Sequence, residues 1–290
     1  MQPHCARPWA LVTIAILGIA NLALGVRPSR AAEPDYQAMI SRHGEAIVTL
    51  KLVMKMSFGG RGAGGDQEVE SEVTGVMIDS AGLVLCSNTQ LGGIGGMMSG
   101  MLGRSIPGFS ISSDVVNVKL LYGPDDQEFE AKVIARDPDL DLAWIQVDAN
   151  DHPFPSVDLS QAADVSLGMH LFGVKRMGKH FDRCAVVFLT IVSGEATKPR
   201  KLWIPEVLVG GFGLPVFDAG GKVAGIVVLQ FPDASENAGA GGNPFAMLGS
   251  MFSMQDSYRG MILPAADVAS ATARARKAQP AKQADKTAAP

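Results

Sequence analysis

Residues 210–226 read GGFGLPVFDAGGKVAGI, and this stretch is the most informative segment of the chain for predicting its fold. A short apolar strand at Leu214–Phe217 is followed by an Asp-Ala-Gly-Gly turn and a second apolar strand at Val223–Leu229. A turn rich in Gly and Asp between two apolar runs is typical of a β hairpin. The stretch therefore predicts two adjacent antiparallel strands, with Phe212 in the glycine-rich segment that precedes them.

The same pattern of short strands and turn signals extends in both directions from this hairpin. Further strands are predicted at Ala46–Met56, Glu68–Asp79, Leu83–Cys86, Val115–Tyr122, Glu128–Arg136, Leu142–Val147, Met169–Val174, Ala185–Val192 and Leu202–Leu208. Short helices are predicted at Glu33–His43 and Ala265–Arg274, and Asn150–Pro155 is a candidate linker. Many short strands in two halves favour two β-barrels, although periodicity alone leaves a single sandwich open.

Composition and charge narrow the class of protein. The chain has 290 residues, 47% of them apolar and 19% charged, which is typical of a folded globular protein. Its net charge is −4, so no broad basic field is available to hold nucleic acid. No zinc-finger or nucleotide-binding spacing occurs, and we expect no cofactor.

The N-terminus has the pattern of an export signal. Arg7 precedes an uncharged apolar run from Trp9 to Val26, and small residues around Ala31 offer a cleavage point. An uncleaved membrane anchor is the alternative, because the run approaches the length that spans a bilayer. We favour the cleaved signal, since Gly18 and Asn21 weaken the run as a spanning helix.

Three segments, in this order, resemble the trypsin-like serine proteases of the HtrA/DegP family. They are TGVMIDSAGLVLCSNTQ at residues 74–90, FEAKVIARDPDLDLA at 129–143 and the Gly210–Ile226 stretch. In the family, the segment that corresponds to the first is a strand ending Thr-Asn-Asn-His, and the one that corresponds to the third reads Gly-Asn-Ser-Gly-Gly-Pro-Leu. The resemblance covers the chain from about Asp35 to Arg274.

This resemblance implies an all-β fold of two six-stranded trypsin-like β-barrels with short N- and C-terminal helices. It divides the chain into residues 1–32 as signal peptide or anchor, 33–152 as the N-terminal barrel, 153–276 as the C-terminal barrel and 277–290 as a disordered tail. We expect no PDZ domain after the second barrel. The family also implies export to the periplasm or cell envelope of a bacterium.

The positions that match the catalytic triad hold Gln90, Asp141 and Phe212. A serine protease needs a hydroxyl nucleophile, an imidazole base and a carboxylate that orients the imidazole. The amide of Gln90 is no base and Phe212 has no side-chain heteroatom, so only the carboxylate is present. The backbone N–H groups of Gly210 and Phe212 match the oxyanion hole and need no particular side chain.

Without a histidine partner, Asp141 is expected to hydrogen-bond backbone amides in a turn or at a strand start. Phe212 is expected to fill the groove that a substrate carbonyl would use. The neighbouring residues Gly211 and Leu214 stand where the family has Asn and Gly. These replacements indicate that the turn no longer needs the backbone conformation that catalysis requires.

Other residue patterns offer weaker sites. His180, Asp182 and Cys184 alternate, so an extended strand would place them on one face for zinc binding or a Cys-His pair, but we prefer a polar strand edge. His170 is expected to be a satisfied core histidine. Cys86 and Cys184 could form a disulfide, but we favour two unpaired, buried small residues.

The sequence thus favours a pseudoprotease that binds or scaffolds a polypeptide or envelope protein without cleaving it. The alternative is an active serine endopeptidase of the HtrA family that serves protein quality control. The Gly- and Met-rich stretches Gly92–Pro107 and Gly239–Met254 could supply adaptable contacts, pack on their own domain or support a homo-oligomer. Membrane contact is expected only if the N-terminal segment is retained.

Overall fold

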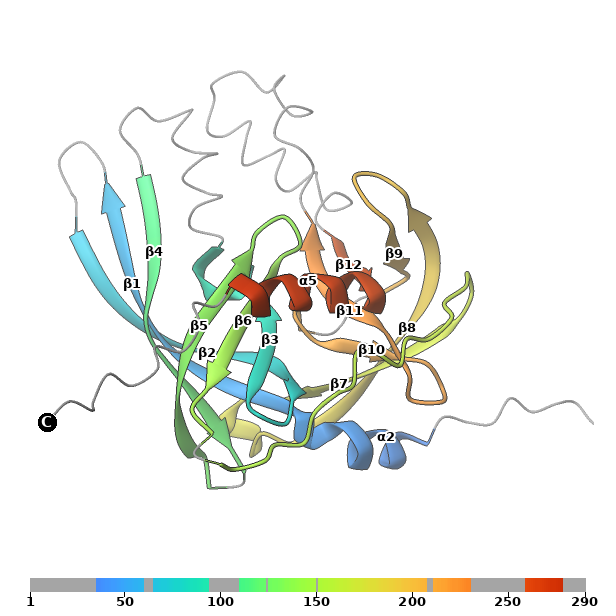
Figure 1. Ribbon diagram of the computed structural model, residues 1–290, viewed down its shortest axis with the longest axis horizontal. Helices are drawn as coiled ribbons and strands as arrows, with labels where there is room; N and C mark the ends of the chain where they lie inside the picture. Colours follow the sequence, from blue (N-terminus) through green and yellow to red (C-terminus); the bar gives the residue numbers. More distant parts are fainter. Residues whose placement is uncertain are drawn as a thin grey trace, which may run out of the picture. The chain divides into compact units, whose positions relative to one another are not determined.

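The computed structural model describes residues 35–59, 65–93, 110–123, 125–149, 151–207, 211–230 and 259–278. These residues form two closed antiparallel barrels, shown in Figure 1. The strand order is β1-β2-β3-β6-β5-β4 in the first barrel and β10-β11-β12-β9-β8-β7 in the second. The prediction of two six-stranded barrels with a short helix at each end is confirmed.

The bounds of the elements follow the predicted order. The first barrel contains β1 (Ile47–Gly59), β2 (Gly65–Asp79), β3 (Leu83–Ser87), β4 (Ser110–Tyr122), β5 (Gln127–Asp137) and β6 (Leu142–Val147). The second contains β7 (His170–Arg176), β8 (Ala185–Ala196), β9 (Leu202–Pro205), β10 (Pro215–Phe217), β11 (Val223–Gln230) and β12 (Arg259–Pro264). The helices are α2 (Tyr36–His43) and α5 (Ala265–Ala278), with short turns at η1 (Gly44–Ala46), η2 (Thr89–Gly93) and η3 (Lys179–Phe181).

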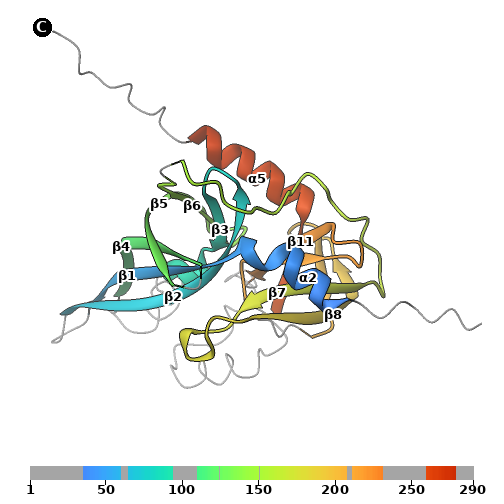
Figure 2. The same ribbon diagram turned by 90° about the horizontal axis from the view of Figure 1, so that it is seen from below.

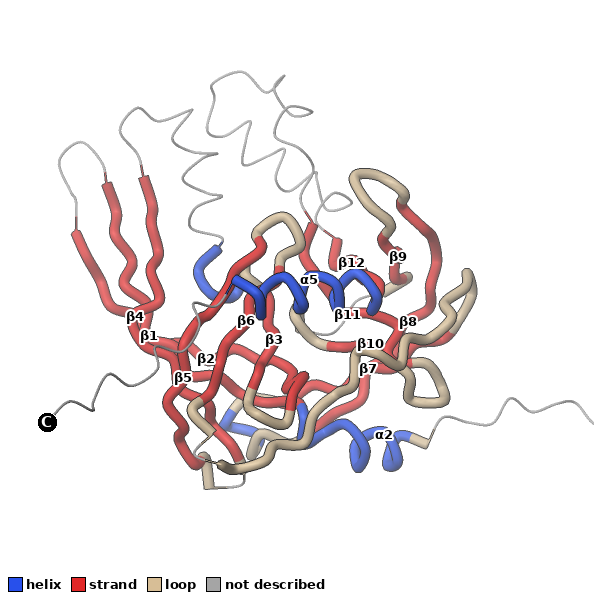
Figure 3. Tube along the Cα trace, viewed as in Figure 1, coloured by secondary structure: helices blue, strands red, loops and turns tan. Residues whose placement is uncertain are grey.

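Strands β1, β2 and β4 are longer than their apolar patterns predicted, and their ends project from the first barrel (Figure 3). Along this projection Lys55 lies opposite Glu68 on β2 and Asp114 on β4. Opposite charges on facing strands support pairing where few apolar residues are available. The first strand was predicted to end at Met56 because a search for apolar alternation does not detect charged residues that pair across strands.

The two barrels share one continuous core. Buried residues of the first barrel, such as Leu85 and Leu142, belong to the same packed cluster as Leu214 and Phe217 of the second. Helix α5 follows the second barrel and extends across to the first (Figure 2). There the indole N–H of Trp144 on β6 donates to the hydroxyl of Thr272 at 3.0 Å.

At the other end of the chain, helix α2 packs on the β10–β11 hairpin. The ring of His43 stacks on Phe217 with centroids 3.8 Å apart, and a guanidinium N–H of Arg42 donates to the carbonyl of Gly220 at 2.9 Å. His43 is only 7% exposed, and its Nε2 has no hydrogen-bond partner among the described residues. These contacts therefore attach helix α2, which precedes the first barrel in the sequence, to the second barrel.

Several predictions made for the ends and loops lie outside the described residues. These are the signal segment, nearly all of both Met-rich stretches, residues 60–64 and residues 279–290. Lys277 and Ala278 are helical, so α5 continues into the region expected to be a disordered tail. Neither described helix is long and apolar enough to cross a membrane.

Burial of His43 makes the folded state sensitive to acid. Burial, together with the positive charge of Arg42, lowers the pKa of His43 to about 4 from 6.5. Between these two values the unfolded chain takes up a proton that the folded chain refuses, so stability falls as the pH falls. The loss by pH 4 amounts to about 3 kcal/mol.

The variant His43→Phe keeps the ring stacked on Phe217 but cannot take up a proton. We expect urea unfolding between pH 7 and pH 4 to show a smaller loss of stability for this variant than for the wild type. The same change at the exposed His170 is the control and should preserve the wild-type pH dependence. Equal pH slopes for His43→Phe and the wild type would refute this role of His43.

Candidate functional site

Asp141 is the most deeply buried polar group at the positions that the sequence singled out. It ends the turn between β5 and β6, with a positive φ of 55° and 2% of its surface exposed. Its backbone N–H donates to the carbonyl of Pro138 at 3.3 Å, and its own carbonyl accepts from Asn88 at 3.1 Å. Asp tolerates this left-handed backbone better than most residues, so the turn can aim a carboxylate into the interior.

The carboxylate of Asp141 accepts from three neighbours. The hydroxyl of Ser87 lies 3.0 and 2.9 Å from its two oxygens. The backbone N–H of Thr89 donates at 2.7 Å and that of Leu229 at 2.9 Å. Ser87 is the last residue of the first barrel's β3 and Thr89 follows that strand, whereas Leu229 belongs to β11, so one buried carboxylate joins the two barrels. Hydrogen bonds to backbone amides were expected for Asp141; the bridge between the barrels was not.

Gln90 lies next to this cluster but is not bonded into it. It is half-buried in the η2 turn, and its Oε1 atom is buried without a hydrogen-bond partner among the described residues. The hydrogen bonds of Asp141 go to Thr89 and Ser87, and no bond to the Gln90 amide accompanies them in the described structure. Among the described residues, Asp141 therefore does not orient the Gln90 side chain in the way that a triad carboxylate orients its base.

Phe212 is half-buried and packs against the core of the second barrel. That core cluster contains Leu171, Val216, Val227 and Ile262, among others. The ring thus has a structural contact on its own barrel. That it fills a substrate groove stays a prediction, and Gly210, the other oxyanion-hole position, lies outside the described residues.

Gly213 brings the Phe212 turn against the first barrel. Its φ is 82°, and a Cβ there would lie 2.4 Å from the backbone nitrogen of Ser87 and 2.9 Å from the carbonyl carbon of Cys86. Its N–H donates to the carbonyl of Val227 at 2.7 Å. Only glycine permits this approach, which places the turn beside the strand end that carries Ser87.

Two of the weaker sequence interpretations are corrected by the structure. Residues 179–181 form a short 3₁₀ turn, and Asp182 and Arg183 have positive φ, so His180, Asp182 and Cys184 are not on one face of a strand. No cluster of His, Cys, Asp and Glu suited to a metal occurs within the described ranges. His170 is exposed rather than in the core, because it is the first residue of β7, where the barrel begins.

The two described cysteines are free and differ in environment. Cys86 is fully buried, as expected, and burial raises the pKa of its thiol to about 12. Cys184 is exposed, which contradicts the expectation that it is buried.

Sequence reasoning identified none of the three partners of Asp141. Ser87 and Thr89 were part of the quoted TGVMIDSAGLVLCSNTQ segment, but their chemistry was not weighed. The buried position of Ser87 at the end of an apolar strand was a usable signal, because a buried hydroxyl needs a partner. The N–H of Leu229 carries no side-chain signature, so no pattern could have indicated it.

Comparisons with known proteins agree with this fold. The family model described as "Trypsin-like peptidase domain" matches residues 73–226, more than half of the chain. A protein of Hahella chejuensis named "Probable periplasmic serine endoprotease DegP-like" is 24% identical over 74% of this chain and 46% of its own length. A protein of the same name from Pseudomonas fulva is 27% identical over 57% of this chain and 30% of its own length. The chain thus spans less than half the length of these curated relatives.

A solved structure gives the same picture of the fold. An HtrA-type protease with a tripeptide superposes with a TM-score of 0.52 at 16% identity, over 84% of this chain and 65% of that one. At this identity the likeness concerns the fold alone.

We predict that Asp141→Asn destabilises the protein although the substitution preserves size. An amide offers one accepting oxygen and two N–H donors, so at least one of Ser87, Thr89 and Leu229 loses its acceptor or faces another donor. The expected loss is about 2–4 kcal/mol in the free energy of unfolding, measured by urea denaturation.

Asp139→Asn is the matched control, since Asp139 is exposed in the same turn. It should change the unfolding free energy by less than about 0.5 kcal/mol. Equal effects of the two substitutions would show that the carboxylate of Asp141 does not join the barrels.

Proposed function

The chain belongs to the trypsin-like peptidase domain family, and on that premise we propose that it is an HtrA-like domain that binds polypeptides without cleaving them. Its place of action would be the periplasm or envelope of a bacterium, as for the distant DegP-like relatives, which are named periplasmic. The bound partner would be a polypeptide or an envelope protein.

The main support for this proposal is the set of hydrogen bonds that the Asp141 carboxylate accepts. In a serine protease that carboxylate orients the imidazole which activates the nucleophile. Here its hydrogen bonds come from Ser87, Thr89 and Leu229, and no histidine of the described chain donates to it. These bonds support a structural role for the acid.

The residues at the other two triad positions support the same conclusion. Gln90 cannot take a proton near neutral pH, and Phe212 has no atom that could attack a carbonyl. In a protease of this mechanism, loss of the nucleophile or the base alone lowers turnover about 10⁶-fold. Ser87 does not replace the nucleophile, because its side chain is fully buried and bonded to Asp141.

The parts of the fold that recognise a peptide do not depend on the triad. Trypsin-like domains can bind an extended peptide by adding it to a strand edge, where backbone hydrogen bonds provide the affinity. The tight approach of Gly213 to Ser87 preserves the junction between the barrels at this position. A binding role therefore needs only the frame that the chain retains.

We predict that the purified chain is not labelled by a fluorophosphonate probe and leaves casein intact. Such probes react with an activated serine, and a chain with Phe212 at the nucleophile position offers none. Labelling is read by in-gel fluorescence and casein integrity by electrophoresis, with trypsin as the positive control. Labelling, or casein degradation that Asp141→Ala abolishes, would favour an active HtrA-type endopeptidase instead.

Binding is predicted separately from cleavage. The fluorescence anisotropy of labelled, unfolded casein should rise when the chain is added. The anisotropy of labelled native lysozyme, a folded control protein, should not rise. The casein should be recovered at full length afterwards. No anisotropy change at micromolar chain concentrations would contradict the binding role and favour a structural envelope protein.

A further inference from the structure

A cavity of about 590 Å³ lies between the two barrels and shares no lining residue with the cluster around Asp141. It is bounded by the start of β1, the β4–β5 turn and the hairpin between β7 and β8. Its volume falls in the range of small-molecule sites, and apolar side chains such as Ile47 and Leu121 supply part of its wall. The cavity is independent of the proposed peptide binding.

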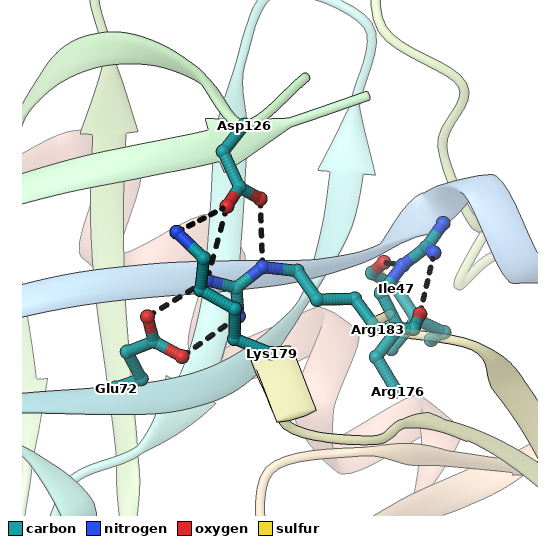
Figure 4. A network of polar contacts seen from close by, with 6 residues as sticks. All are labelled: Ile47, Glu72, Asp126, Arg176, Lys179 and Arg183. Carbon is teal, nitrogen blue, oxygen red and sulfur yellow. Dashed lines mark hydrogen bonds and ion pairs between the residues drawn. The ribbon is translucent and has the colours of Figure 1, made fainter. Parts of the chain in front are cut away.

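Two of the cations that line the cavity are paired with acids, as Figure 4 shows. The guanidinium of Arg183 forms a fork with Glu72, with both N–O distances 2.7 Å, and its Nε lies 2.7 Å from Asp126. Lys179 lies 3.7 Å from the same Asp126 carboxylate. These pairs tie the β7–β8 hairpin to the first barrel and give both cations an acidic partner.

Arg176 differs from these two cations because it has no carboxylate at ion-pair distance in the described structure. It donates to three backbone carbonyls: Ile47 at 2.5 Å, Gly44 at 2.8 Å and Arg183 at 3.2 Å. A guanidinium has five N–H donors, so these three bonds leave two without an assigned acceptor. Figure 4 shows Arg176 directed to Ile47, with the acids gathered around the head of Arg183.

The position of Arg176 is unfavourable for a charge without a counter-ion. It is half-buried, and burial lowers the pKa of its guanidinium, an effect that the negative charge of Glu45, beyond ion-pair distance, partly opposes. Taking a charge out of water is compensated best by an opposite charge with matching hydrogen bonds, and a carboxylate matches a guanidinium in both respects. An anion that enters the cavity would supply that partner.

Acidic groups stand at the exposed part of the same lining. Glu45 and Asp182 are exposed, and neither takes part in an ion pair within the described ranges. The cavity therefore combines a half-buried cation with two carboxylates near solvent that form no ion pair within the described ranges. We propose that it binds a small zwitterion, with a free α-amino acid as the simplest case, whose carboxylate pairs with Arg176 and whose ammonium group faces Glu45 and Asp182.

Cys184 provides a direct readout, because its exposed thiol lines the cavity whereas Cys86 is buried. The full chain is treated with N-ethylmaleimide in the presence of each common L-amino acid, and modification of Cys184 is followed by peptide mass mapping. An amino acid that binds should slow modification about tenfold at about ten times its Kd. Its amide, which lacks the carboxylate, and its des-amino analogue, which lacks the ammonium group, should protect less.

Substitutions then test the two charged ends. Glu45→Gln should weaken protection about tenfold, since the exposed side chain can be changed without loss of a structural bond. Glu206→Gln, at an exposed position away from the cavity, is the matched control. Arg176→Lys keeps the charge but not the planar guanidinium with its five N–H donors and should also weaken protection, with circular dichroism showing that the fold is retained.

The proposal is overturned if no amino acid slows modification of Cys184, or if the amide protects as well as its parent acid. Equal protection in Glu45→Gln and Glu206→Gln would overturn the role of the acidic side. None of these results would bear on casein binding, so the two proposals are tested separately.

Discussion

One buried carboxylate holds together the part of the molecule in which a trypsin-like domain carries its chemistry. Asp141 accepts from Ser87 and Thr89 on one barrel and from Leu229 on the other. A buried charge is tolerated only when it is fully bonded, so the three donors must stay where they are. The end of β3, the β5–β6 turn and the end of β11 are therefore fixed relative to one another by a single side chain.

Other contacts close the same junction from different sides. Trp144 bonds to Thr272 at helix α5, and Arg183 is bonded to Glu72 and Asp126 across the outer face. The indole bond is buried, whereas Glu72 is partly exposed and its pair is weakened by solvent. The junction thus depends on a buried acid and a buried indole more than on the visible ion-pair network.

The sequence predicted the strands well because their signals are local, whereas their arrangement in two six-stranded barrels was implied by the family resemblance. Apolar alternation and turn residues such as Gly82 and Pro138 mark strands and their ends without knowledge of the fold. The errors occur where position in the barrel decides the outcome. His170 is exposed because it opens a strand, and Asp182 leaves the strand pattern because its backbone is left-handed. The sequence indicated which side chains to examine at the site. The hydrogen bond from the Leu229 amide to Asp141 depends on how the barrels pack and could be identified only from the structure.

We propose that Asp141 stands at the acid position of the triad, and its bonds to both barrels would then explain why this position keeps its residue while Gln90 and Phe212 stand at the other two. Removing an imidazole or a serine hydroxyl affects catalysis, and Gln90 and Phe212 can be accommodated by half-buried packing. Replacing the acid leaves buried donors of both barrels unsatisfied, which lowers stability whether or not the protein cleaves anything. An aspartate at this position is thus required by the fold and is by itself no evidence of hydrolysis. Evidence of activity must come from the nucleophile and the base.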